Sequence, residues 1–256
     1  ILALGLRGLG FIACQMALTV AVAYLIGRKM GFGKKFSLLM GAGNAVCGSS
    51  AIATVSPVVK ANSKDKGISI TIVNVTGTIL MVVLPILTGV VYQHEVMHTS
   101  AMIGGTLQSI GQVIASAQLV GGEVVETATI FKIIRIVFIV LVALAFSRMN
   151  VEKDDTPLFS KSEAGEYGAV KAGVPWFIIG FFIMAILHSV GVIPPVVSHA
   201  AKLVSQQFEI IALAAIGMRV KFCDLAAEGP RAMLYGVGVG ACQIVFALVL
   251  IRVFIG

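Results

Sequence analysis

The chain has 256 residues, of which 58% are hydrophobic and 12% are charged, whereas ordinary soluble domains are about 45–50% apolar and about 25% charged. This composition excludes an ordinary soluble domain and predicts an all-α, polytopic membrane protein, because several apolar runs approach the roughly 20 residues that cross a bilayer. The net charge of +7 comes mainly from short loops between these runs, which argues against a nucleic-acid-binding surface.

Six apolar segments and two interrupted segments follow one another along the chain. The apolar segments cover 8–26, 68–92, 124–147, 174–193, 204–218 and 232–255. The interrupted segments cover 37–59 and 101–122, and a polar linker at 148–172 is expected to be cytoplasmic. Because the chain starts at Ile1 within an apolar run, we expect N-terminal helices to be missing, and we treat 1–256 as one transmembrane domain.

The distribution of Lys and Arg predicts which loops share a side of the membrane. Fourteen of the nineteen cations lie in four loops, at 27–36, 60–67, 148–172 and 219–231. Cytoplasmic loops carry such an excess. The loops 27–36 and 60–67 share that side only if 37–59 enters the membrane and turns back, and 101–122 then enters from the opposite side. If both segments instead span as broken helices, the bias weakens, so we favour two re-entrant segments.

The two interrupted segments carry small polar residues and resemble each other. GNAVCGSSAIATV (43–55) aligns without gaps to GTLQSIGQVIASA (105–117), which indicates an inverted repeat around a midplane site. A break at bilayer depth exposes half-helix N-termini, which favour an anion. Helix packing through small residues is the alternative. The residues expected to bind substrate are Asn44, Cys47, Gly48, Ser49 and Ser50 in the first segment, and Gln108, Ser109 and Gln112 in the second.

The apolar segment 124–147 carries two cations near its middle, Lys132 and Arg135. Inserting a cationic side chain at this depth of the bilayer costs at least about 2.5–3.5 kcal/mol of free energy. Such a residue therefore usually faces a cavity or a partner. Arg135 offers a planar fork for an oxyanion and Lys132 a point charge, so we predict that both neutralise an anionic substrate. The alternatives are snorkelling to the headgroups and an ion pair with Glu126 or Glu209.

The remaining chemistry-bearing residues form no recognisable catalytic or metal-binding pattern. The four cysteines and four histidines lack ligand spacing, and the sequence contains neither a P-loop nor a nucleophile elbow. We therefore predict that the protein is not an enzyme, and we expect neither a metal nor a cofactor.

In these motifs the chain resembles the YeiH-like family, whose members are labelled sulfate exporters. That family is similar to the cation:proton antiporter and anion transporter superfamily. Its pattern G-T-A-I-C-G-A-S-A-I-A-A-V-A-P-V-I-K is matched by GNAVCGSSAIATVSPVVK at 43–60. Further matches are GTILMVVLP (77–85), ATIFKIIR (128–135), PWFIIGF and AAIGMR. The resemblance covers essentially the whole chain and implies a secondary-transporter fold with inverted repeats and further N-terminal helices.

The second interrupted segment departs from the family pattern. The family shows S-I-H-E-V-A-Q-V where this chain has TLQSIGQV at 106–113, so Gln108 and Ser109 replace a His-Glu pair. A proton-coupling role of that pair therefore does not transfer to this chain.

These observations predict a secondary transporter of a small anion, with sulfate or a related sulfur oxyanion or sulfonate as substrate and alternating access as mechanism. We place it in the bacterial plasma or inner membrane, with the lipid bilayer as partner and H+ or Na+ as the candidate coupling ion. A homo-oligomer is a further candidate assembly of the chain. The alternatives are a passive anion channel, a Na+/H+-coupled antiporter and a non-transporting membrane scaffold.

Overall fold

The computed structural model describes residues 5–149, residue 151, scattered positions between 180 and 211, and residues 230–256. Two compact units divide the chain, Ile1–Ala172 with Phe222–Gly256, and Gly173–Lys221. The features below belong to the first unit. The expected segments 174–193 and 204–218 and most of the linker 148–172 lie outside the described residues.

Long apolar helices account for four of the six predicted apolar segments. Among the described residues, four helical stretches are long and apolar enough to cross a bilayer: α1 (Gly5–Lys29), α4 (Ser63–Tyr92), α7 (Gly122–Val137) continued by α8 (Ile139–Ser147), and α12 (Pro230–Phe254). Every regular element among the described residues is a helix, which confirms the all-α, polytopic membrane class. Helix α12 illustrates this class. Its apolar side chains Leu234, Val245 and Val249 are exposed, as side chains that meet lipid would be.

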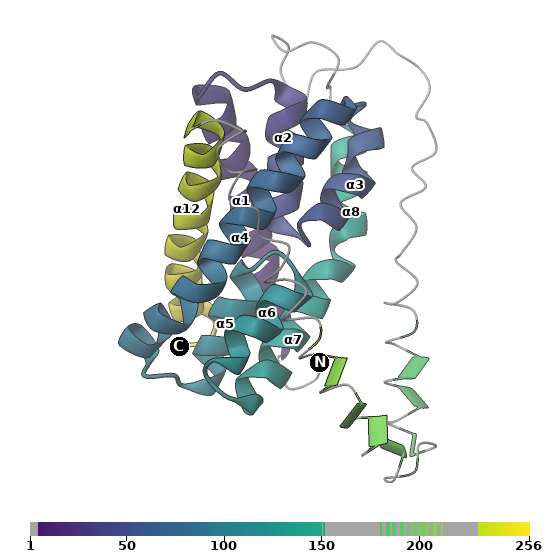
Figure 1. Cartoon of the computed structure of the whole chain (residues 1–256), viewed down its shortest axis with the longest axis vertical. Coiled ribbons are helices and arrows are strands. Elements are labelled where there is room, and N and C mark those ends of the chain that lie inside the picture. Colours follow the sequence, from purple (N-terminus) through teal and green to yellow (C-terminus); the bar gives the residue numbers. More distant parts are fainter. Residues whose placement is uncertain are drawn as a thin grey trace. The chain divides into compact units, whose positions relative to one another are not determined.

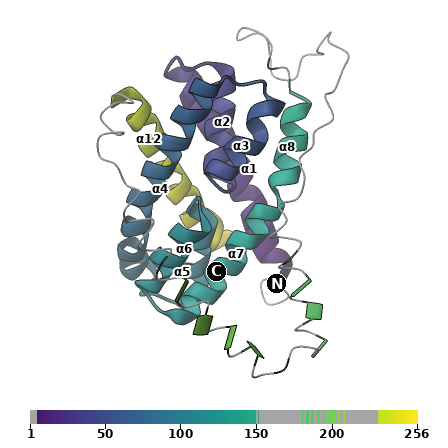
Figure 2. The same ribbon diagram turned by 45° about the vertical axis from the view of Figure 1, so that its right-hand side comes forward.

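Two helical hairpins lie between these spans. They are α2 (Lys34–Ala45) with α3 (Ser49–Val58), and α5 (Val96–Thr106) with α6 (Ile110–Gln118). The longest of the four helices, α2, has 12 residues and is therefore about 18 Å long, too short for a hydrocarbon layer of about 30 Å. In Figures 1 and 2 the α2–α3 hairpin occupies the upper half of the bundle and the α5–α6 hairpin the lower half.

The first hairpin starts and finishes at the same end of the bundle. The Lys35 ammonium at the start of α2 donates a hydrogen bond to the Lys60 carbonyl beyond the end of α3, at 3.0 Å. This contact brings the two ends of the hairpin together, as the re-entrant interpretation of 37–59 requires. The second hairpin has nearly the same helix lengths and enters from the opposite end, as an inverted repeat requires.

Different local chemistry makes the two turns. In the first, Gly48 has φ 66° and ψ −124°, a conformation that only glycine adopts without strain, and the Ser50 hydroxyl donates to the Cys47 carbonyl at 3.4 Å. In the second, Ser109 and Gln112 form a capping box, in which each side chain accepts from the other's main-chain N–H at 3.1 Å. Both turns thus satisfy part of the main chain that the breaks leave unpaired.

Glycine lets the second hairpin pack closely on α7. A Cβ atom at Gly104 would overlap the Ala128 carbonyl oxygen and lie 2.8 Å from the Phe131 Cβ. Since the first obstacle is main chain, no side-chain rotation could relieve it.

Gly104→Ala is therefore expected to destabilise the protein by about 1–3 kcal/mol, the usual cost of overpacking. Gly238→Ala is the matched control, because Gly238 also lies inside a helix and a Cβ there would meet nothing within 4 Å. Thermal unfolding in detergent should show a lower melting temperature for Gly104→Ala only. Equal melting temperatures for the two variants would contradict the close packing.

Candidate functional site

Lys132 of α7 joins the turns of the two hairpins. Its ammonium donates to the Val46 carbonyl at 2.5 Å and to the Leu107 carbonyl at 2.8 Å. Val46 follows the last residue of α2, and Leu107 follows the last residue of α5. The last carbonyls of a helix lack partners within the helix and carry the negative end of its dipole. Lys132 therefore supplies charge and donors to two helix ends at once.

Arg135, one turn further along α7, contacts the same two helix ends. Its Nε donates to the Ala45 carbonyl at 2.5 Å, its Nη1 to the Leu107 carbonyl at 2.9 Å, and its Nη2 to the Asn44 carbonyl. The side chains of Arg135 and Lys132 are both 0% exposed, which excludes snorkelling to the headgroups. The Arg135 guanidinium, which was predicted to bind an oxyanion, thus donates to main-chain carbonyls. Direct contact of either cation with a substrate stays a prediction.

A buried amide cluster surrounds this junction and includes residues that the sequence did not single out. Gln108 Nε2 faces Asn44 Oδ1 at 3.2 Å and Gln243 Oε1 at 3.5 Å. Gln243 Nε2 donates to the Asn44 carbonyl at 2.9 Å and lies 3.4 Å from Thr19 Oγ1. The Gln15 amide donates to the Gln243 carbonyl at 2.8 Å. Side chains from α1, α2, α12 and the α5–α6 turn therefore form one polar cluster within the apolar bundle.

The remaining predicted residues lie at the N-terminal ends of α3 and α6. Ser49 and Ser50 are exposed, and no side chain of the described chain caps α3. Cys47 is 7% exposed and directly follows Val46, whose carbonyl accepts from Lys132. A Cβ atom at Gly48 would lie 3.5 Å from the Gln108 Cβ, so the two turns touch. Gln112 Nε2 reaches the Asn74 carbonyl of α4 at 3.3 Å.

The structure thus brings most of the predicted site residues together and leaves two at the edge. The two turns form one junction with Lys132 and Arg135. Ser49 and Ser50 lie at the edge of this junction and are exposed. Gln15, Thr19 and Gln243 were missed, although a glutamine inside a long apolar run is itself a signal of a buried polar contact.

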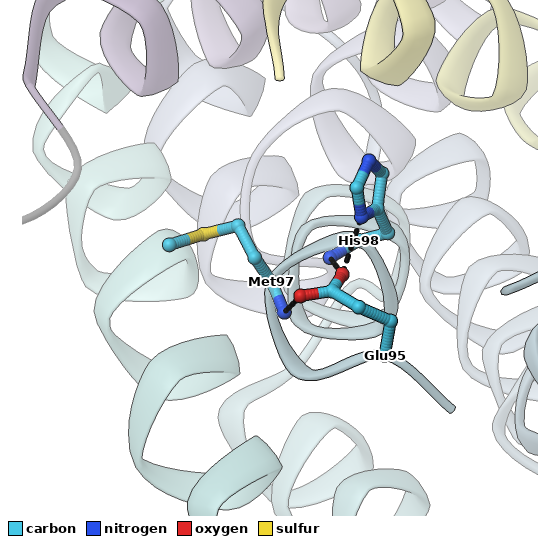
Figure 3. A network of polar contacts seen from close by, with 3 residues as sticks. All are labelled: Glu95, Met97 and His98. Carbon is cyan, nitrogen blue, oxygen red and sulfur yellow. Dashed lines mark hydrogen bonds and ion pairs between the residues drawn. The ribbon is translucent and has the colours of Figure 1, made fainter. Parts of the chain in front are cut away.

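A second polar network lies at the end of the bundle where α4 connects to α5 (Figure 3). Glu95 caps α5 by accepting from the main-chain N–H of Met97 at 3.1 Å and of His98 at 2.8 Å. The His98 ring Nδ1 also contacts the Glu95 carboxylate. Partial burial alone would raise the pKa of Glu95, but the hydrogen bonds from His98 and Met97 outweigh it and lower this pKa below its ordinary value of 4.5.

Because its pKa is lower in the folded chain, ionised Glu95 stabilises the fold above about pH 4.5, and this contribution is lost as the pH falls through the folded-state pKa. We expect Glu95→Gln to melt below the native chain at pH 7, and the difference to shrink steadily as the pH falls below 4.5. Melting curves across this range test it. A difference that is the same at pH 7 and in acid would contradict a charge-dependent cap.

Known proteins resemble this chain along nearly its whole length. The family model described as conserved hypothetical protein 698 matches residues 1–236. A UPF0324 membrane protein of Clostridium perfringens is 56% identical over 100% of this chain and 74% of its own length. One of Lactiplantibacillus plantarum is 44% identical over 97% of this chain and 74% of its own length. The UPF0324 membrane protein TauZ of Paracoccus denitrificans is 31% identical over 99% of this chain and 71% of its own length. No solved structure matches the chain.

Proposed function

This chain belongs to the conserved hypothetical protein 698 family of UPF0324 membrane proteins, and we propose that it is a secondary transporter of a small anion. The family is consistent with the resemblance of the sequence motifs to YeiH-like proteins, and the apolar helices place the chain in a cell membrane. Following that resemblance, we propose sulfate or a related sulfur oxyanion or sulfonate as the substrate.

The observation that carries the proposal is the meeting of two broken helix pairs beside two buried cations. The hairpins enter from opposite ends of the bundle, and the carbonyls at 44–46 and at 107 share Lys132 and Arg135 as donors. Broken helices of this kind place a binding site near the bilayer midplane in many transporters. Because Lys132 and Arg135 neutralise the C-terminal ends of α2 and α5, the N-terminal ends of α3 and α6 are left to favour an anion.

The same geometry disfavours a sodium ion at this junction. In transporters with broken helices, main-chain carbonyls at half-helix C-termini commonly coordinate Na+. Here those carbonyls accept hydrogen bonds from Lys132 and Arg135, so these two side chains take the place that Na+ would occupy.

We therefore expect anion uptake into proteoliposomes to proceed at the same initial rate when choline replaces Na+ on both sides of the membrane. An uptake that disappears without Na+ would contradict this assignment and would support the sodium-coupled alternative.

Counterflow of labelled anion tests the proposal as a whole. Proteoliposomes loaded with unlabelled sulfate, thiosulfate or a small sulfonate should transiently accumulate a trace of the same labelled anion above its equilibrium level. A carrier gives this overshoot because its site is exposed to one side at a time. A passive channel equilibrates the label without overshoot, and a scaffold gives no flux beyond that of empty liposomes.

A further inference from the structure

Two oxygens of the amide cluster, Gln15 Oε1 and Gln108 Oε1, have no hydrogen-bond partner among the described residues, and Gln108 Oε1 is the one at the junction of the hairpins. Gln108 is 1% exposed, and its Oε1 is among the buried polar atoms of the described chain that accept no hydrogen bond. A buried acceptor without a donor is costly, so native proteins rarely keep one without a function. Gln108 lies in the turn between α5 and α6, at the junction of the two hairpins.

The neighbours of Gln108 fix which end of its amide points away from the cluster. Asn44 Nδ2 donates to the Met40 carbonyl at 2.9 Å, which leaves Asn44 Oδ1 as the atom facing Gln108. Gln243 Nε2 donates to the Asn44 carbonyl, which likewise leaves Gln243 Oε1 facing Gln108. Turning the Gln108 amide over would place its oxygen against two other oxygens. The nitrogen is therefore held in the cluster, and Oε1 is held outside it.

Gly77 of α4 packs closely against this buried oxygen. A Cβ atom at Gly77 of α4 would lie 2.5 Å from Gln108 Oε1 and 2.6 Å from Gln112 Oε1. The same turn faces Gly48, whose added Cβ would come within 4.0 Å of Asn74 Oδ1. Gln108 Oε1 thus faces α4 beside the N-terminal ends of α3 and α6, and it can only accept a hydrogen bond.

We propose that Gln108 Oε1 accepts a hydrogen bond from the substrate, so that the site binds small anions that carry an O–H donor more tightly than it binds anions without one, such as sulfate. The inference rests on the proposed anion transport and deepens it. A site built to hydrogen-bond a donor discriminates strongly against the analogue that lacks it, because the acceptor is then left unpaired. Hydroxyl-substituted sulfonates fit this description, and a plain alkylsulfonate does not.

The test compares two sulfonates that differ in one hydroxyl group, 2-hydroxyethanesulfonate and ethanesulfonate. Their inhibition constants are measured against sulfate counterflow in proteoliposomes of the native chain. We expect 2-hydroxyethanesulfonate to inhibit at least about tenfold more strongly. Gln108→Met removes the acceptor and should bring the two constants together. Tyr235→Phe is the control, because it also removes a buried hydrogen bond, from the Tyr235 hydroxyl to the Ala23 carbonyl, but lies outside the amide cluster, and it should keep the preference.

Each outcome of this comparison decides the inference. A hydroxyl preference that Gln108→Met loses and Tyr235→Phe retains supports it. Equal inhibition by the two sulfonates, or sulfate counterflow that neither sulfonate inhibits, overturns the inference and leaves anion transport standing. A preference that survives in Gln108→Met also overturns it. Absence of counterflow for sulfate and for both sulfonates overturns the inference together with the proposed function.

Discussion

Arg135→Met is expected to destabilise the protein by at least about 3 kcal/mol, because the change leaves the carbonyls of Asn44 and Ala45 without these donors in a buried, apolar setting. The Leu107 carbonyl would keep Lys132 as a donor. The C-terminal ends of α2 and α5 would also lose the guanidinium that bridges them. A fall in melting temperature of about 5–10 °C should accompany the loss.

Two further variants separate this effect from a general loss of charge. Arg252→Met removes an exposed arginine from the last turn of α12 and should melt close to the native chain. Arg135→Lys keeps the charge but loses the planar fork, so it should fall between the two. If Arg135→Met and Arg252→Met melt alike in detergent, Arg135 does not hold the hairpins.

Gly77→Ala is expected to reduce anion counterflow at least about tenfold, since the new methyl group would enter the space of Gln108 and Gln112. Its Cβ would lie 2.5 Å from Gln108 Oε1 and 2.6 Å from both polar atoms of the Gln112 amide. Both side chains are held by hydrogen bonds to other elements, so they cannot move aside without breaking the amide cluster.

The control for this change is Gly67→Ala in the same helix, where a Cβ would meet nothing within 4 Å. Gly67→Ala should keep native counterflow and gain slightly in stability, because alanine is the better helix former. The measurement is the initial counterflow rate per correctly folded protein. Native transport by Gly77→Ala would show that the space between α4 and the amide cluster has no part in the transport cycle.

The sequence predicts the hairpins because their signals are local. Gly48 lies between two helix-forming runs, and the basic loops at 27–36 and 60–67 are separated by too few apolar residues for two spans. The mid-span depth of Lys132 and Arg135 follows from their position in 124–147. Neither inference needs knowledge of which helices are neighbours.

The contacts of the two cations could not be predicted, because they depend on long-range packing. Arg135 is 90 residues from Ala45, and Gln243 is 199 residues from Asn44. The chemistry of an arginine in a membrane allows a substrate anion, an acidic side chain or a helix C-terminus as partner, and only the arrangement of the hairpins selects among them. The sequence therefore identified the residues of the junction without identifying what they hold.

The modification rate of Cys47 tests most directly whether a transported anion occupies the junction of the two hairpins. In a variant whose other three cysteines are serine, an anionic methanethiosulfonate should modify Cys47 slowly, because the thiol is 7% exposed. A saturating concentration of the anion that shows counterflow should slow the reaction further, whereas single-cysteine variants that keep Cys14 or Cys242 should react at rates that the anion does not change. Equal rates at Cys47 with and without the transported anion would contradict the account.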